Sequence, residues 1–215
     1  MFIERELRFY FSLSKVTFWQ NKLRHYTRFG GRFFNRTLLY DNPNPALSFY
    51  APEVDGRFRL RLFKVLEPAQ SSQVSYSLIS WKQRLKKEKG LNIEKELEIK
   101  FAAADFDLLD RLFRDVLKMP YKGGYELYRS FFYFEEKIEI TLNEYPFALA
   151  LELELKEGAD LEILSVAVEK LGLKDKKPSL LSNDDFYAQL CRDEGLEPGE
   201  EIFFRTSPMP QLKDE

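Results

Sequence analysis

The chain has 215 residues, of which 44% are hydrophobic and 32% are charged, enough apolar content for one domain with a substantial core. Its 33 basic and 35 acidic side chains nearly cancel, which argues against a protein that coats nucleic acid through bulk positive charge. The single cysteine excludes an intramolecular disulfide framework, the single histidine excludes His-rich zinc sites, and no apolar run is long enough to span a bilayer. We therefore expect one cytoplasmic domain over residues 1–215, with no nucleic-acid or membrane partner.

The first predicted strand, residues 3–9, carries an unusual row of charge. Side chains alternate between the two faces of a strand, so Glu4, Glu6 and Arg8 point the same way. Carboxylates suit a divalent cation and a guanidinium suits a polyanion. Taken alone, the row is more typical of the solvated face of an edge strand.

A helix is predicted next, over residues 12–28, because apolar residues recur there at helical spacing. Gly30 and Gly31 are expected to end it, since glycine commonly follows a helix. The alternative is that Phe29-Gly30-Gly31-Arg32 cradles a phosphate through its backbone amides. A strand over residues 34–41 and a proline-containing loop follow.

Charged rows recur on the later predicted strands. Residues 56–63 alternate strictly, which places Arg57, Arg59 and Arg61 on one face and apolar residues on the other. Such like charges repel one another unless anions neutralise them. After a strand over residues 74–81, the strand over 92–101 carries an acidic row. Its members are Glu94, Glu96 and Glu98.

The second half of the chain is predicted to add strands and amphipathic helices. A helix capped by Asp105 and a Gly123-Gly124 break precede three strands, of which the last carries Glu152 and Glu154. The expected ranges are helix 105–117, strands 126–134, 137–143 and 147–155, helices 159–171 and 184–192, and a surface tail over 195–215.

These elements predict an α+β fold: an eight-stranded antiparallel β-barrel with helices packed outside. The helices do not alternate regularly with the strands, which favours an antiparallel sheet. If the apolar faces carry the helices, the charged faces line a closed lumen, where acids would hold divalent cations and bases a phosphate chain. The alternative leaves the charged faces in solvent.

The charged rows also resemble a known family, motif by motif. Glu4-x-Glu6-x-Arg8 resembles the ExExK signature of the CYTH family, which unites class IV adenylate cyclases with thiamine triphosphatases and whose members are also called triphosphate tunnel metalloenzymes. Further segments match in the same order. They are Leu39 to Pro43 ("YFDTP"), Gly56 to Arg61 ("GxxLRIR"), Ile79 to Lys82 ("LTxK"), Glu96-x-Glu98, Arg129 ("KxRxxY") and Leu151 to Glu154 ("FxEIE").

The resemblance implies a charged tunnel that binds a small triphosphate with Mg²⁺ or Mn²⁺. Carried over residue by residue, the metal ligands would be Glu4, Glu6, Glu152 and Glu154. The triphosphate-binding residues would be Arg8, Arg59, Arg61, Lys82 and Arg129. Arg8, Glu96 and Glu98 would complete the catalytic set, the two glutamates by ordering water or the basic side chains.

Four positions depart from the family pattern. Arg8 replaces a lysine, and Leu127 stands where a second lysine is expected. Glu94 occupies an arginine position, and Asn143 falls where an aspartate is usual. Arg8 keeps its charge but not the geometry of lysine, and the other three changes remove positive or metal-binding groups, so activity is expected to be reduced or altered.

The leading functional hypothesis is a metal-dependent hydrolase of a small triphosphate, such as inorganic tripolyphosphate or thiamine triphosphate, acting as a monomer or homodimer. The alternative within the family is an adenylate cyclase that converts ATP to cyclic AMP. The departures also leave open a tunnel that binds triphosphates or nucleotides without turnover. A charge-decorated barrel around an apolar ligand is the remaining alternative.

Overall fold

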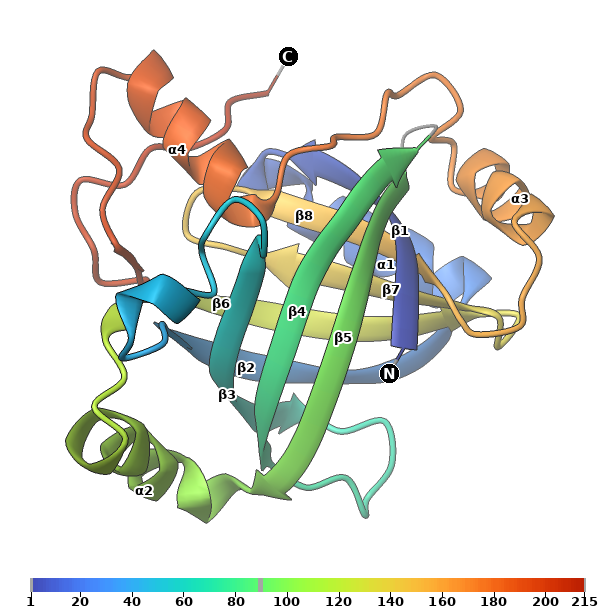
Figure 1. Ribbon diagram of the computed structural model, residues 1–215. Helices are drawn as coiled ribbons and strands as arrows, with labels where there is room; N and C mark the ends of the chain where they lie inside the picture. Colours follow the sequence, from blue (N-terminus) through green and yellow to red (C-terminus); the bar gives the residue numbers. More distant parts are fainter. Residues whose placement is uncertain (1, 89–90, 215) are drawn as a thin grey trace.

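The computed structural model describes residues 2–88 and 91–214 and forms a closed barrel with helices around it (Figure 1). Side chains at positions 2, 4 and 86–88 are outside this description, so the predicted role of Glu4 lies outside the described residues. The strands are β1 (Phe2–Phe11), β2 (Arg28–Tyr40), β3 (Gly56–Glu67), β4 (Tyr76–Glu88), β5 (Leu91–Ala102), β6 (Tyr121–Phe134), β7 (Ile138–Glu144), β8 (Leu149–Leu155) and the two-residue β9 (Glu201–Ile202).

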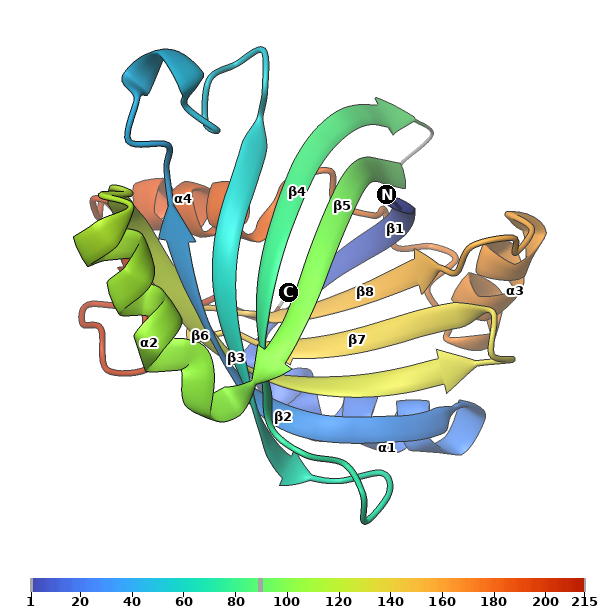
Figure 2. The same ribbon diagram turned by 60° about the horizontal axis from the view of Figure 1, so that its bottom comes forward.

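Eight of these strands close into an antiparallel barrel, as predicted. Their order is β2-β3-β4-β5-β1-β8-β7-β6, and pairing of β2 with β6 closes the ring. In Figure 2, β3, β4 and β5 arch across from β7 and β8. The short strand β9 adds to β6 in parallel. Closure removes the exposed edges that an open sheet would present.

The helices lie outside the barrel and cover its apolar faces. They are α1 (Val16–Tyr26), α2 (Phe106–Arg111), α3 (Glu162–Lys170) and α4 (Asn183–Asp193). Trp19 and Leu23 of α1 share one buried cluster with Leu164 of α3 and the outward-facing residues of β7 and β8. α2 packs on β2 and β3, and α4 packs through Tyr187 and Cys191 on a second cluster. Most apolar residues of the strands therefore face outward and most charged residues face inward, although Phe33, Phe63 and Phe131 form an apolar cluster at the cavity wall.

The double glycine after α1 does not end that helix, contrary to the prediction. α1 ends at Tyr26, and β2 has already begun at Arg28. The pairing of β2 with β6 is interrupted between Phe29 and Gly31, which is a β-bulge. Gly31 has a φ of +112°, and a Cβ built on it would lie 2.6 Å from Oε1 of Gln73. Glycine is needed here because of the bulge, not because a helix stops.

Two other local predictions also differ from the structure. Gly123 and Gly124 lie inside β6, where a Cβ on Gly123 would come within 2.1 Å of the carbonyl oxygen of Glu200. Asp105 makes no side-chain capping hydrogen bond, and α2 continues from Arg111 into a π-helical turn over Leu112–Val116.

The chain after residue 200 packs on the barrel: Ile202 and Phe203 are buried, and the Leu212 amide donates to the Phe147 carbonyl.

Candidate functional site

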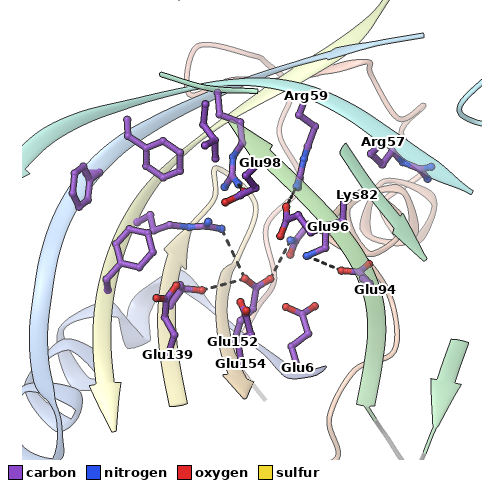
Figure 3. A pocket seen from close by; sticks show the side chains of 18 of the residues that line it. Glu6, Arg57, Arg59, Lys82, Glu94, Glu96, Glu98, Glu139, Glu152 and Glu154 are labelled. Atoms are coloured by element: carbon purple, nitrogen blue, oxygen red, sulfur yellow. Dashed lines mark hydrogen bonds and ion pairs between the residues drawn. The ribbon is translucent and has the colours of Figure 1, made fainter. Parts of the chain in front are cut away.

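The barrel encloses a cavity of about 770 Å³ that is lined mainly by charged side chains (Figure 3). Its bases and acids are similar in number, which matches the near-neutral composition of the chain. The bases are Arg8, Arg57, Arg59, Arg61, Lys82, Arg84, Lys100 and Arg129, and the acids are Glu6, Asp55, Glu94, Glu96, Glu98, Glu139, Glu152, Glu154 and Asp184.

Strand register brings these residues together across the barrel wall. Arg8 of β1 lies directly opposite Glu152 of β8, and two pairs along, on the same face, Glu6 lies opposite Glu154. Glu154 in turn faces Glu139 of β7. Directly opposed side chains have Cβ atoms about 4.5–5.5 Å apart, so the register alone produces a row of three neighbouring carboxylates.

Arg8 and Glu152 form a buried, hydrogen-bonded ion pair. The Arg8 Nε donates to Oε1 of Glu152 at 2.7 Å, one terminal nitrogen donates to Glu6, and the other donates to the Leu181 carbonyl at 3.0 Å. Burial alone would raise the pKa of Glu152, but the positive charges of Arg8 and Arg129 outweigh it and lower that pKa to about 2. Glu152 is therefore ionised throughout the physiological range.

The pKa of Glu154 is shifted in the opposite direction from that of Glu152. Burial raises the pKa of Glu154 to about 8, and the carboxylates of Glu139 and Glu6 add to the rise. Burial likewise raises the pKa of Glu6 and that of Glu139. Within the described part of the chain, Glu154 has neither an ion pair nor a hydrogen bond. A cation at this row would relieve the repulsion between its carboxylates.

The basic side of the cavity is built around three arginines. The Arg59 Nε donates to the Ser80 hydroxyl at 2.9 Å, and its Nη2 donates to Glu96 at 2.6 Å. Arg129 donates to Oδ1 of Asn143 at 2.6 Å. Arg61 is only 6% exposed, and its Nε has no hydrogen-bond partner in the described structure.

Arg61 is poorly compensated for a buried cation. The nearest carboxylate to it is that of Glu98, at 3.8 Å. Burial lowers the pKa of Arg61, and the like charges of Arg59 and Arg129 lower it further. An anion bound between these arginines would supply the missing charge and accept the unused N–H.

A second group of ion pairs joins the strands to α4. Lys82 contacts Glu94 at 2.7 Å, and Arg84 bridges Asp55 at 3.7 Å and Asp185 at 3.4 Å. Asp185 also completes a capping box with Ser182 at the start of α4. The first turn of α4 therefore lies beside the cavity, and its Asn183 donates to Glu152 at 3.3 Å.

The structure places every predicted site residue with a described side chain in or on this one cavity. The lining includes Glu6, Arg8, Arg59, Arg61, Lys82, Glu96, Glu98, Arg129, Glu152 and Glu154. Their individual roles remain predictions. Sequence reasoning missed Glu139, although it alternates with Ile138, Ile140 and Leu142 and so belongs on the same face as the other acids. It also missed Asn183, for which no strand pattern could have given a signal.

Part of the acidic lining has the donor groups that a divalent cation needs. Mg²⁺ is commonly held by one or two carboxylates together with substrate phosphates. Glu154, with its unused oxygens, fits that requirement, and Glu6 lies next to it. Glu152 does not fit as it stands, because both its oxygens already accept hydrogen bonds. Among the described residues, no group of three or more His, Cys, Asp or Glu is arranged to hold a metal ion.

Two of the departures from the family pattern have local explanations. Leu127 is fully buried in an apolar cluster with Tyr145 and Phe147, where a lysine would lack an acidic partner. Asn143 uses its amide group in both directions: it accepts from Arg129 and donates to Glu152 at 2.8 Å. An aspartate could not make the second of these bonds.

No family model matches the chain, and no curated protein matches it in sequence. Solved structures match in fold. A Hippeastrum protein, a candidate adenylyl cyclase with a dominant triphosphatase activity, is 17% identical with a TM-score of 0.58 and covers 91% of this chain and 97% of its own. A candidate adenylate cyclase from Vibrio parahaemolyticus is 15% identical with a TM-score of 0.57, covering 84% and 95% of the two chains.

A third structure, a protein from Pyrococcus horikoshii, is 20% identical with a TM-score of 0.57 and covers 86% of this chain and 98% of its own. In the part of the chain that the structure describes, no helix has the length and apolarity needed to cross a bilayer. The matches span nearly the whole length of each neighbour, so the likeness is to the complete barrel and not to one hairpin. The chain has the barrel fold of candidate adenylate cyclases and a triphosphatase, which is the fold that its resemblance to the CYTH family implies.

Proposed function

We propose that this chain is a CYTH-type enzyme that hydrolyses a small triphosphate inside its barrel, with Mg²⁺ or Mn²⁺ as the metal. The observation that carries the proposal is the poorly compensated charge of Arg61, which is buried near the like charges of Arg59 and Arg129, has Glu98 only at 3.8 Å and has an unused N–H. A buried cation in this state favours an anionic ligand, and guanidinium groups match phosphate oxygens in geometry.

The remaining groups of the cavity support this assignment. Glu96 holds Arg59 at 2.6 Å, so it can keep the guanidinium directed at a phosphate chain. Glu98 lies beside Arg61 at the longer distance of 3.8 Å, as an ion pair without a hydrogen bond. Hydrolysis of a phosphoanhydride depends mainly on positioning and charge neutralisation, which a preorganised set of arginines supplies.

The acidic row of Glu139, Glu154 and Glu6 lies beside the Arg8–Glu152 pair, two residues along the strands on the same face. We assign the cation to Glu154 and Glu6, because Glu154 has oxygens free to coordinate. When bound, the cation would neutralise phosphate charge and help to orient the chain. The triphosphatase activity of the Hippeastrum protein supports hydrolysis over cyclisation.

The test is release of phosphate from tripolyphosphate, thiamine triphosphate and ATP with Mg²⁺ or Mn²⁺, with cyclic AMP and pyrophosphate monitored in the ATP reactions. We expect metal-dependent phosphate release. Cyclic AMP with pyrophosphate would instead identify a cyclase. Binding of tripolyphosphate without turnover would identify a binding protein, and the absence of both would contradict the proposal.

Arg61→Met tests the observation that carries the proposal. Removing a charge-assisted contact is expected to weaken tripolyphosphate binding roughly 10- to 100-fold by calorimetry. Because the variant also removes a buried, poorly compensated charge, its ligand-free form should unfold at the same or a higher temperature than the wild type. Arg28→Met is the matched control, since Arg28 pairs with Glu136 on the outside of the protein. Equal loss in both variants would contradict the assignment.

A further inference from the structure

Every nitrogen of the Arg8 side chain already donates to a protein acceptor. Its Nε and both terminal nitrogens donate to Glu152, Glu6 and the Leu181 carbonyl, and the residue is only 6% exposed. A guanidinium can make such a fan of bonds because its donors are fixed in one plane. A lysine has a single nitrogen on a flexible stem and could not hold two carboxylates and a carbonyl in the same fixed geometry.

Glu152 is equally occupied. Its Oε1 accepts from Arg8 at 2.7 Å and from Asn183 at 3.3 Å. Its Oε2 accepts from Thr141 at 3.1 Å and from Asn143 at 2.8 Å. An ionised carboxylate offers about four lone-pair sites, so these four bonds leave none for a cation.

The same two residues fix the segment that leads into α4. The Ser179 amide donates to the Arg8 carbonyl at 2.7 Å, the Leu181 carbonyl accepts from the Arg8 side chain, and Asn183 reaches Glu152. Tyr10 also donates to Asn183 at 2.8 Å. The Arg8–Glu152 pair is therefore part of the connection between the barrel and α4, and displacing Arg8 would break contacts on both sides.

We propose that Arg8 is a permanent internal cation that neutralises Glu6 and Glu152, so that Glu152 is a positioning residue and not a metal ligand. The family resemblance implies instead that Arg8 binds triphosphate and that Glu152 binds metal. The difference follows from arginine standing where the family pattern has lysine. The inference concerns the site of the proposed function, but it describes the ligand-free protein and does not require turnover.

The test is Mn²⁺ binding to the folded protein without phosphate, measured by electron paramagnetic resonance and calorimetry. Glu152→Gln is expected to leave the Mn²⁺ affinity within twofold of the wild type. Arg8→Met leaves Glu6 and Glu152 without their neutralising cation and is expected to raise the Mn²⁺ affinity at least tenfold. The double variant Arg8→Met/Glu152→Gln should lose that gain. Arg28→Met, which removes an external arginine, should change nothing.

Two results would overturn the inference: a tenfold loss of Mn²⁺ affinity in Glu152→Gln, or the absence of any gain on replacing Arg8. If Arg8→Met does not fold, Arg8→Lys gives the second measurement. Its ammonium is a single charge on a flexible stem and would hold the two carboxylates less rigidly than the guanidinium, so a smaller gain in the same direction is expected, and no gain counts against the inference. If the protein does not hydrolyse triphosphates, the proposed function is overturned, but the comparison of Mn²⁺ affinities among these variants still tests the role of Arg8.

Discussion

Glu154 shows how the barrel changes the chemistry of an ordinary side chain. The register of β7, β8 and β1 aligns it with Glu139 and Glu6 along the cavity wall, where Glu6 is buried and the other two are half-buried. Like charges directly opposite each other destabilise a sheet, and burial adds a desolvation cost for the ionised form. A strand position that costs stability and faces a cavity is best explained by the ligand that it serves.

The raised pKa of Glu154 predicts a pH-dependent stability. Its pKa is about 8 in the folded protein against an ordinary value of 4.5, so the folded state holds the proton more tightly than the unfolded state. The resulting stabilisation is complete below pH 4.5 and is lost as the pH rises toward 8. Glu154→Gln has no such proton, so its melting temperature relative to the wild type should rise between pH 5 and pH 9.

Thermal unfolding without metal at several pH values measures this difference. Glu157→Gln is the matched control, because Glu157 is exposed in the turn that follows β8. A constant difference between Glu154→Gln and the wild type across the range would show that Glu154 titrates normally.

The contacts between side chains inside the cavity could be predicted only in part from the sequence. Alternation along β3 and β5 predicts which face their arginines and glutamates share, because each strand fixes that face by its period of two. Which partner a long side chain selects depends on neighbouring strands and on α4. The choice of Glu6, Glu152 and Leu181 by Arg8 therefore required the three-dimensional structure.

At the scale of elements, the start of β2 is the clearest difference between pattern and structure. A glycine pair after an apolar helix is typical of a helix stop, yet here the pair lies within a strand. Gln73, in the loop between β3 and β4, donates to the Gly30 carbonyl at 3.0 Å and fills the space beside Gly31. A contact between segments so distant in sequence has no local signal.

This arrangement predicts that Gly31→Ala is costly. The substitution forces an alanine to a φ of +112° and places its Cβ 2.6 Å from the Gln73 side chain. We expect a loss of about 2–4 kcal/mol in urea unfolding, from backbone strain of about 1–3 kcal/mol plus the collision. Gly158→Ala is the control for strain alone, because it has a φ of +79° and no neighbour within 4 Å.

The collision is tested separately by combining the substitution with Gln73→Ala. The double variant should recover part of the loss if the Gln73 side chain is the obstacle. Equal losses in Gly31→Ala and Gly158→Ala would show that Gln73 moves aside without cost and that only the backbone conformation matters.

At the scale of the whole molecule, a net charge of −2 conceals a separation of charge within the barrel. Most basic groups of the cavity lie on β3, β4 and β6 and most acids on β5, β7, β8 and β1, with Arg8 on β1 and Lys100 on β5 as the exceptions. The barrel was predictable because many strands repeat the same amphipathic pattern and because closure is the arrangement that uses both faces. The segment after residue 195 does not repeat this amphipathic pattern, so its packing on the barrel could not be predicted from periodicity.

The packing of that last segment predicts that neighbouring phenylalanines differ in their effect on the whole fold. Phe203 is 1% exposed, while Phe204 is 42% exposed. Phe203→Ala should lower the free energy of unfolding by about 3 kcal/mol or more, because it leaves a cavity where the segment meets the barrel. Phe204→Ala should cost about 1 kcal/mol or less, since surface changes have small effects. Urea unfolding of both variants gives the comparison. If both are neutral, the segment lies on the barrel without stabilising it, whereas a large loss for Phe203→Ala alone shows that the barrel depends on it.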